Sequence, residues 1–169
     1  LSLHDALPIF KACRRTKRIL VVDPYTAYVL DSLRDISSGI PQHDWKDSFR
    51  VFNIPNTATK KLGLDKSLFK FKHAKITIDE IQIQYSNLVI KENYMIRIFL
   101  KNKGMLKNAT NIYSMWDGYL KSDNFWIDNG VPVIKIHCSG HAYREDLVKL
   151  VESLKPKRLT HNHNFHPES

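Results

Sequence analysis

A short apolar run followed by an amphipathic helix places the strongest constraint on how this chain folds. Residues 131–136 read Val-Pro-Val-Ile-Lys-Ile, a β-branched composition that favours a buried strand. After a loop, apolar side chains recur at helical spacing, with charged ones opposite, until Pro156 stops the helix. The apolar positions, which we expect to pack, are Leu147, Leu150, Val151 and Leu154. A second strand is expected to begin at Arg158, so the unit is strand, helix, strand, and it indicates an α/β fold.

Histidine is concentrated on the loops of this unit, because five of the eight histidines lie within the last 33 residues. Parallel sheets bind ligands at the carboxyl ends of their strands, and imidazole binds metals and exchanges protons near neutral pH. Two blander interpretations stay open. His161, His163 and His166 would then form a solvated terminal tail, and His137 would be a strand-end histidine bonded to backbone.

The loop between the expected strand and helix also carries a serine and a glycine. Ser139 and Gly140 lie between His137 and His141. A hydroxyl followed by a glycine, which lets backbone N–H groups approach closely, makes a small anion cradle. A phosphate group would fit this loop.

These residues carry a family resemblance. The sequence HCSGHA, the helix, the turn KPKRL and a histidine 22 residues after His141 resemble the carboxyl-terminal part of the β-CASP nucleases. These are metallo-β-lactamase-fold enzymes that include RNase J and the cleavage-factor endonucleases. The similarity is specific from Val131 to His163. Upstream it is weaker, at Lys11–Leu33 and Ile112–Tyr119.

The resemblance implies a role for each residue of the motif. His163 would be a zinc ligand, and His141 the general acid that protonates the departing ribose oxygen. His137, Ser139 and Gly140 would hold a substrate phosphate. The activity implied is hydrolysis of RNA phosphodiester bonds with two zinc ions, which lower the pKa of the attacking water and stabilise developing charge.

The chain departs from the family pattern in its metal ligands. The family's His-x-His-x-Asp-His motif is absent from the sequence, and His163 alone remains of the ligand set. Because catalytic zinc needs about three protein ligands, we predict that this polypeptide is a fragment and is inactive by itself. Residues 1–9 resemble a translated sequencing-adaptor remnant and are predicted to be non-native.

The resemblance also implies the domain organisation. Residues 10–135 are expected to form a Rossmann-like β-CASP domain, an α/β fold with a parallel sheet and flanking helices. Residues 136–169 are expected to be the return segment of a metallo-β-lactamase αββα domain, in its RNA-specificity region.

Charge and composition bear on partners and compartment. The net charge of +9 favours a polyanion such as RNA, although each lysine-rich cluster can also be an ordinary solvated face. No apolar run is long enough to span a membrane. The two cysteines, Cys13 and Cys138, share no metal-site or disulfide spacing, which favours a reducing, cytoplasmic location. Homodimerisation stays open.

Local patterns predict the upstream elements. We expect helices at Ile9–Lys17, at Pro24–Asp35, near Ile78 and over Asn56–Leu68, and strands at Arg18–Val22, Arg50–Ile54, Leu88–Ile90 and Tyr94–Leu100, the last of which the family resemblance permits to be a helix.

Several single residues receive a structural rather than a functional interpretation. Asp23 could be a catalytic carboxylate, but with Pro24 after it we favour a helix cap. Cys13 is expected to be a small core residue. Packing is favoured over a nucleic-acid cleft for Tyr25, Tyr28 and Trp116, and Phe69 and Phe71 are expected to share one buried face.

Two rival functions remain. One is a noncatalytic RNA-binding relative whose metal site has degenerated, which the positive charge suits equally well. The other is a metallo-β-lactamase-fold hydrolase of a small ester or anhydride. The insertion of roughly 120 residues before His137 counts against the second, because a cap of that size suits a polymer.

Overall fold

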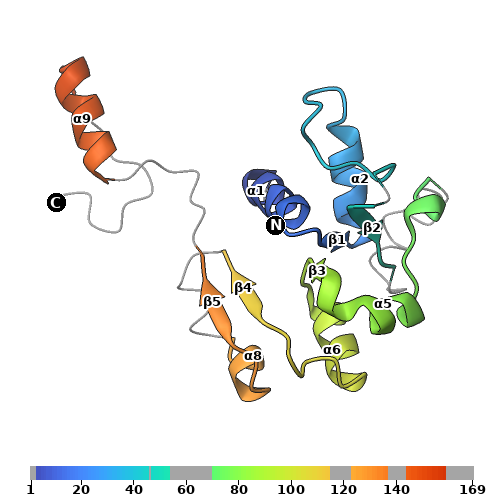
Figure 1. The fold of residues 1–169 in the computed structure, drawn as a ribbon. Helices are drawn as coiled ribbons and strands as arrows, with labels where there is room; N and C mark the ends of the chain where they lie inside the picture. The colour runs from blue at the N-terminus through green and yellow to red at the C-terminus, as the bar shows by residue number, and fades with distance from the viewer. Residues whose placement is uncertain (1–2, 46, 54–69, 115–122, 137–143, 159–169) are drawn as a thin grey trace. The chain divides into compact units, whose positions relative to one another are not determined.

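The computed structural model describes residues 3–45, 47–53, 70–114, 123–136 and 144–158 (Figure 1). The chain forms two units, Leu1–Cys138 and Ser139–Ser169. Both sheets lie in the first unit, and the helix α9 (Arg144–Leu154) lies in the second. None of the helices in the described ranges is long and apolar enough to cross a membrane.

The centre of the first unit is a three-stranded parallel sheet. Its strands are β1 (Ile19–Val22), β2 (Phe49–Val51) and β3 (Leu88–Ile90), in the order β2-β1-β3. Leu20 lies opposite Phe49 on one side and Val89 on the other. All three strands were predicted from the sequence, and the prediction of an α/β fold with a parallel sheet is confirmed.

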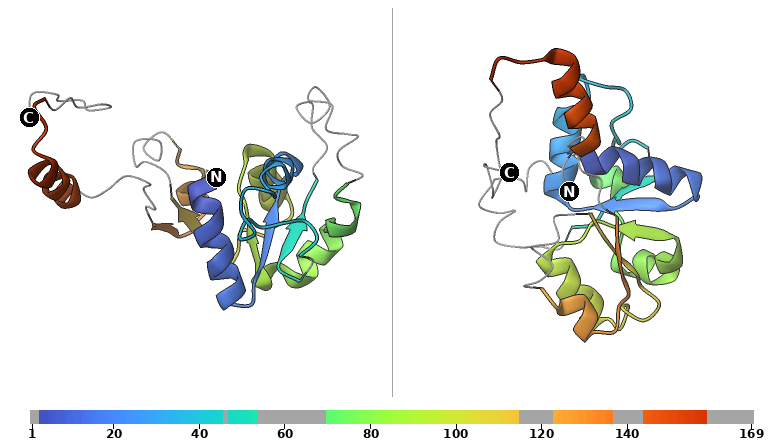
Figure 2. Two further views of the ribbon diagram at one scale, coloured as in Figure 1. Left: turned by 90° about the horizontal axis from the view of Figure 1, so that it is seen from above. Right: turned by 90° about the vertical axis from the view of Figure 1, so that its left-hand side faces the viewer.

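Helices cover both faces of this sheet (Figures 1 and 2). Because side chains alternate along a strand, Leu20 and Val22 face one core cluster and Val21 faces the other. The first cluster receives side chains from α1 (Leu3–Arg15) and α2 (Pro24–Ser32). The second receives them from α5 (Ile78–Gln84) and α6 (Tyr94–Asn102). The layers are therefore helix, sheet, helix.

Helix α1 begins at Leu3, whereas the sequence analysis placed its start at Ile9. The apolar spacing Leu3, Leu7, Phe10 continues the helical period upstream, and both Leu7 and Phe10 contribute to the first core cluster. Cys13 is a core residue, as predicted, with 2% of its surface exposed. Burial raises the pKa of its thiol to about 11.

Asp23 begins α2 as a cap, which confirms the interpretation favoured from the sequence. Its Oδ1 accepts a hydrogen bond of 2.9 Å from the backbone N–H of Thr26, and Pro24 occupies the first turn. The helix ends at Ser32, three residues before the expected Asp35, and turns follow it. Tyr25 and Tyr28 are 56% and 45% exposed, so the packing role predicted for them is wrong; α2 buries its other face.

The prediction of a strand at Tyr94–Leu100 is also wrong, because these residues form α6. Asn93 caps the helix, with its Oδ1 accepting from the N–H of Ile96 at 3.0 Å. Ile96, Phe99 and Leu100 follow helical spacing, and all three contact the second core cluster.

Short helical turns complete this part of the unit. The 3₁₀ turns η1 (Lys72–Ala74) and η2 (Tyr85–Asn87) flank α5, the helix expected near Ile78. Phe71 is buried, as predicted. Phe69 and the helix expected at Asn56–Leu68 lie outside the described residues.

A second, two-stranded sheet pairs β4 (Asn111–Tyr113) with β5 (Val133–Lys135) in parallel. Gly130, with a φ of +69°, allows the turn between the short helix α8 (Phe125–Asp128) and β5. Arg97 of α6 reaches this region: it pairs with Asp123, and its guanidinium lies 5.5 Å from the ring centre of Trp126.

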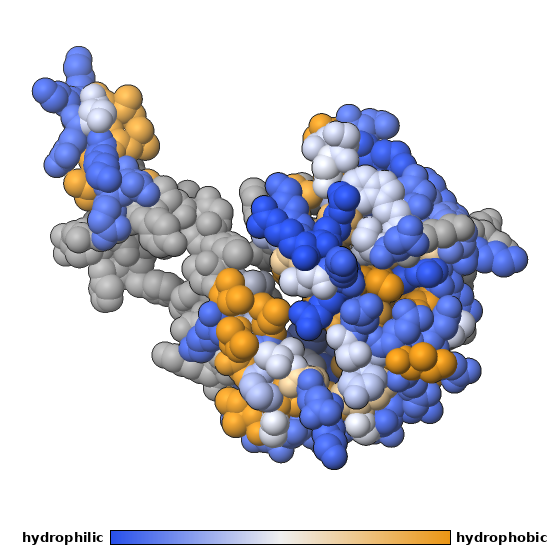
Figure 3. All heavy atoms as spheres, in the orientation of Figure 1, coloured by the Kyte–Doolittle hydropathy of each residue, from blue (hydrophilic) through white to orange (hydrophobic). Residues whose placement is uncertain are grey.

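The strand predicted at residues 131–136 is confirmed as β5, but its burial is not. Ile134 is 50% and Ile136 48% exposed, because the described chain forms a two-stranded sheet and not a sheet covered on both faces. Figure 3 shows the resulting apolar surface over β4, β5 and α8, where Ile112 and Ile127 are also exposed.

In the second unit, α9 confirms the predicted amphipathic helix. Leu147, Leu150 and Leu154 are 49%, 53% and 68% exposed, so the expected packing of this face is not found among the described residues of the unit. Lys155, with a φ of 44°, and Pro156 end the helix. The strand expected from Arg158 lies beyond the described residues.

Candidate functional site

The site residues predicted from the sequence flank α9. His137, Ser139, Gly140 and His141 fall between β5 and α9, and His163 follows α9. All of them, with Cys138 and Trp116, lie outside the described residues. Their roles therefore stay predictions.

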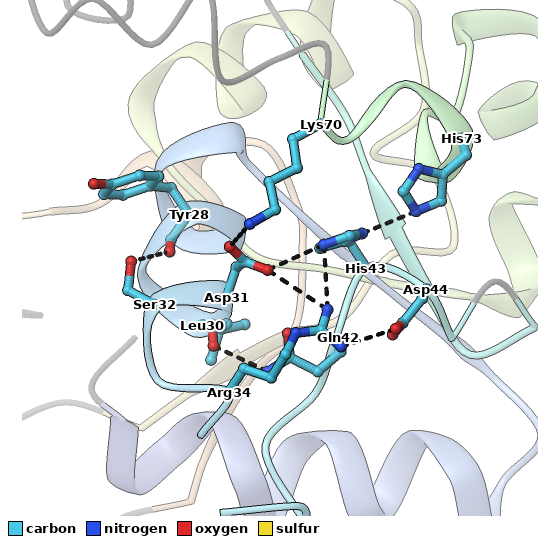
Figure 4. A network of polar contacts seen from close by, with 10 residues as sticks. All are labelled: Tyr28, Leu30, Asp31, Ser32, Arg34, Gln42, His43, Asp44, Lys70 and His73. Carbon is cyan, nitrogen blue, oxygen red and sulfur yellow. Dashed lines mark hydrogen bonds and ion pairs between the residues drawn. The ribbon is translucent and has the colours of Figure 1, made fainter. Parts of the chain in front are cut away.

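Within the described residues, a polar network joins α2, the loop after it and η1 (Figure 4). His43 lies at its centre and is 8% exposed. Its Nε2 lies 3.1 Å from Asp31 Oδ1, and its Nδ1 lies 2.8 Å from His73 Nε2. Asp31 extends from α2 and His73 from η1, so His43 bridges two elements that are distant in sequence.

The chemistry of the partners fixes the arrangement of protons in this network. Asp31 is an acceptor, so Nε2 of His43 must donate to it. In a neutral ring, Nδ1 of His43 then accepts, and His73 must donate from its Nε2. This tautomer leaves Nδ1 of His73 as a hydrogen-bond acceptor on an exposed side chain.

Cations surround Asp31. Lys70 donates a hydrogen bond to its Oδ2, and Arg34 lies 3.5 Å from Oδ1 while donating to Asp44 at 2.9 Å. Burial disfavours the carboxylate of Asp31, but the bond and charge of Lys70, helped by His43, outweigh it and lower the pKa of Asp31. Burial lowers the pKa of His43, although Asp31 acts in the opposite direction.

This arrangement can share a proton between two imidazoles, and it fixes the loop after α2 against η1. Sequence reasoning missed it, because Asp31 and His43 are 12 residues apart and His43 and His73 are 30 apart. No short motif connects them.

The network does not have the donor set of a metal centre. In the parts of the chain that the structure describes, no group of three or more His, Cys, Asp and Glu residues could hold a metal ion. Zinc takes imidazole nitrogen readily, so His163 fits as one ligand by its chemistry. The sequence lacks the remaining ligands of the family motif.

The fold defines an α/β protein whose parallel sheet has helices on both faces. Residues 131–163 match a family model described as a Zn-dependent metallo-hydrolase RNA specificity domain. This match confirms, for that segment, the predicted resemblance to metallo-hydrolases that act on RNA. It covers about a fifth of the chain, and it contains β5, α9 and all of the site residues predicted from the sequence.

Two other comparisons gave no match. Neither a search of curated proteins nor a search of solved structures found a protein similar to this chain.

Proposed function

We propose that this chain is part of a zinc-dependent ribonuclease of the β-CASP type and that it contributes RNA binding and part of the active site. The observation that carries the proposal is the match of residues 131–163 to an RNA specificity domain of zinc-dependent metallo-hydrolases. The matched segment contains the sequence His-Cys-Ser-Gly-His and, after α9, His163.

Two further observations support it. The first unit contains a parallel sheet with helices on both faces, which suits the Rossmann-like β-CASP domain expected at residues 10–135. The net charge of +9 suits a polyanionic substrate, because lysine and arginine gain affinity by releasing phosphate counterions.

Each predicted site residue would then have one task. His137, Ser139 and Gly140 bind a phosphate of the RNA, and the N–H and O–H groups of the loop orient it. His141 donates a proton to the departing ribose oxygen. His163 binds zinc, which when bound lowers the pKa of the attacking water. We propose that the remaining ligands belong to polypeptide outside this sequence and that the 169 residues alone do not cleave RNA.

The decisive experiment uses the completed reading frame. Sequencing the DNA upstream of the codon for Phe10 should reveal a His-x-His-x-Asp-His motif, and the complete protein should cleave single-stranded RNA. His141→Ala should then lower turnover about 10²- to 10⁴-fold with zinc content unchanged. Unchanged turnover in a folded variant would remove His141 from the mechanism.

Zinc binding by His163 has its own test. His163→Ala should lower the zinc content measured by elemental analysis, while the matched control His166→Ala, in the same segment, should leave it unchanged. Equal zinc content in both variants would contradict ligation by His163.

A complete frame without those ligands would favour the rival function, a noncatalytic RNA-binding protein. That protein would bind single-stranded RNA with an affinity that falls as salt rises, and it would leave the RNA intact.

A further inference from the structure

The central sheet of the first unit contains a point at which the chain direction diverges. From β1 the chain enters α2, which packs on one face of the sheet, and β3 is followed by α6, which packs on the other. Since β1 and β3 are neighbours, their two following loops separate toward opposite faces (Figure 2). Open parallel sheets bind ligands at the carboxyl edge where neighbouring loops separate in this way.

A buried ion pair occupies this edge. Asp23 directly follows β1 and Lys91 directly follows β3, and Lys91 Nζ donates to Asp23 Oδ2 at 2.7 Å. The two side chains are 15% and 17% exposed. The hydroxyl of Thr26 also donates to Oδ2, and its N–H donates to Oδ1, so both oxygens of Asp23 are already used.

Lys91, in contrast, keeps donors to spare. An ammonium group carries three N–H donors, and among the described residues Asp23 accepts one of them. A second phosphate-sized acceptor could therefore be bound without breaking the ion pair. The charge of Asp23 is shared among three donors, which weakens its repulsion of an anion.

The start of α6 adds to the positive potential beside Lys91. The cap Asn93 is neutral, and the first turn contains no acidic residue, so no charge compensates the positive end of this nine-residue helix. The N–H groups of Tyr94 and Met95 have no acceptor within the helix, because the first helical N–H groups never do. Glu92, the nearest carboxylate in sequence, is bound by Arg97.

An unpaired acceptor lies at the same edge. Asn53 follows β2, two residues after Val51, and its buried Oδ1 has no hydrogen-bond donor among the described residues. Buried acceptors are usually paired, and a ligand hydroxyl would satisfy this one.

We propose that this carboxyl edge binds one nucleotide of an RNA strand, with Lys91 and the start of α6 holding its phosphate and Asn53 accepting from a ribose hydroxyl. The choice of RNA rests on the proposed function; the phosphate site itself does not. The residues lie on the sheet of the first unit and are separate from the histidine motif.

Binding of labelled single-stranded RNA to the whole 169-residue chain tests the phosphate contact. Lys91→Met alone would leave Asp23 buried and unpaired, so the main variant is Asp23→Asn with Lys91→Met, which retains a good helix cap. Its Kd should rise roughly tenfold, and the slope of log affinity against log salt should fall by about 0.7. The control Lys11→Met removes an exposed lysine and should change Kd less than twofold.

A Kd equal to that of Lys11→Met in a double variant with native circular dichroism would overturn the site. Titration with inorganic phosphate, followed by the amide NMR signals of Tyr94 and Met95, distinguishes a free phosphate from the polymer. Shifts that saturate with RNA at far lower concentration support the RNA site, whereas equal affinity for both would overturn the assignment to RNA.

The hydroxyl contact is tested separately. The 2′-hydroxyl distinguishes RNA from DNA, so Asn53→Ala should reduce the preference for RNA over DNA of the same sequence. An unchanged preference would overturn this contact. Loss of binding at Lys91 in a protein that shows no nuclease activity would retain the site and refute the proposed function, so the two failures are distinguishable.

Discussion

The buried ring of His43 makes a strong prediction about stability. His43→Ala removes the imidazole that bridges Asp31 and His73 and that packs against Phe71, with 5.1 Å between the ring centres. After the substitution Asp31 keeps Lys70 as a partner, and His73 is exposed and can bond to water. Neither remaining group is therefore left as a buried, unpaired charge.

The magnitude follows from these contacts. A hydrogen bond to a charged acceptor contributes about 1.5–3 kcal/mol, and one between neutral groups about 1 kcal/mol. The edge-on packing with Phe71 adds about 0.5–1.5 kcal/mol. Because Asp31 retains other donors, part of the first contribution is recovered. We expect His43→Ala to lower the free energy of unfolding by about 3 kcal/mol.

Urea unfolding followed by circular dichroism measures this change. The control is His73→Ala, which removes one hydrogen bond of the same network from an exposed residue and should lower the free energy of unfolding by about 1 kcal/mol. A loss for His43→Ala no larger than that of the control would refute the role assigned to the buried ring.

The same variant has a pH signature. Burial holds the pKa of His43 below its ordinary value in the folded chain, so on acidification the unfolded chain takes up this proton first. Stability should therefore fall as the pH drops below about 6.5, and His43→Ala should lose that part of the decline. The lowered pKa of Asp31 acts in the same direction, but only below its ordinary value of 3.8. A wild-type stability that rises between pH 7 and 5.5, or a decline equal in His43→Ala, would contradict this reasoning.

Three further substitutions test the fold by the same urea assay. Phe49→Ala empties a fully buried position and should cost about 3–5 kcal/mol, whereas Ile36→Ala, at a residue that is 74% exposed, should stay within about 0.5 kcal/mol; equal effects would contradict the core assignment. Arg97→Lys should cost about 1–2 kcal/mol, because a lysine cannot pair with Glu92 and Asp123 together while covering an aromatic ring; full stability would exclude this bridge. Thr77→Ala should cost about 1 kcal/mol through the lost capping box of α5, and Thr77→Ser should restore most of it unless the box is unimportant.

Elements with strong local signals were predictable from the sequence. Asp23 and Pro24 form a cap and first turn that follow directly from residue type, and β1 is an uninterrupted apolar run. At Tyr94–Leu100 the sequence satisfies two periods, because Ile96, Ile98 and Leu100 alternate while Ile96, Phe99 and Leu100 follow a helix. The cap Asn93 and the burial of the second set decide for the helix.

The candidate sites differ in how far the sequence reveals them. The histidine motif at residues 137–141 is contiguous, and the segment around it matches a metallo-hydrolase RNA specificity domain. The network at His43 joins three distant parts of the chain, so tertiary packing alone creates it. Lys91 belongs to the same category, because its meaning depends on β3 lying beside β1.

The pair β4–β5 has a practical consequence for anyone who purifies this polypeptide. Ile112 and Ile134 lie opposite each other in register and are about half exposed, on strands that within the described chain pair only with each other. Exposed apolar strands of this kind act as templates on which further strands add, one molecule after another. Self-association at high concentration would therefore begin at these isoleucines, while the well-packed sheet at β1 stays intact.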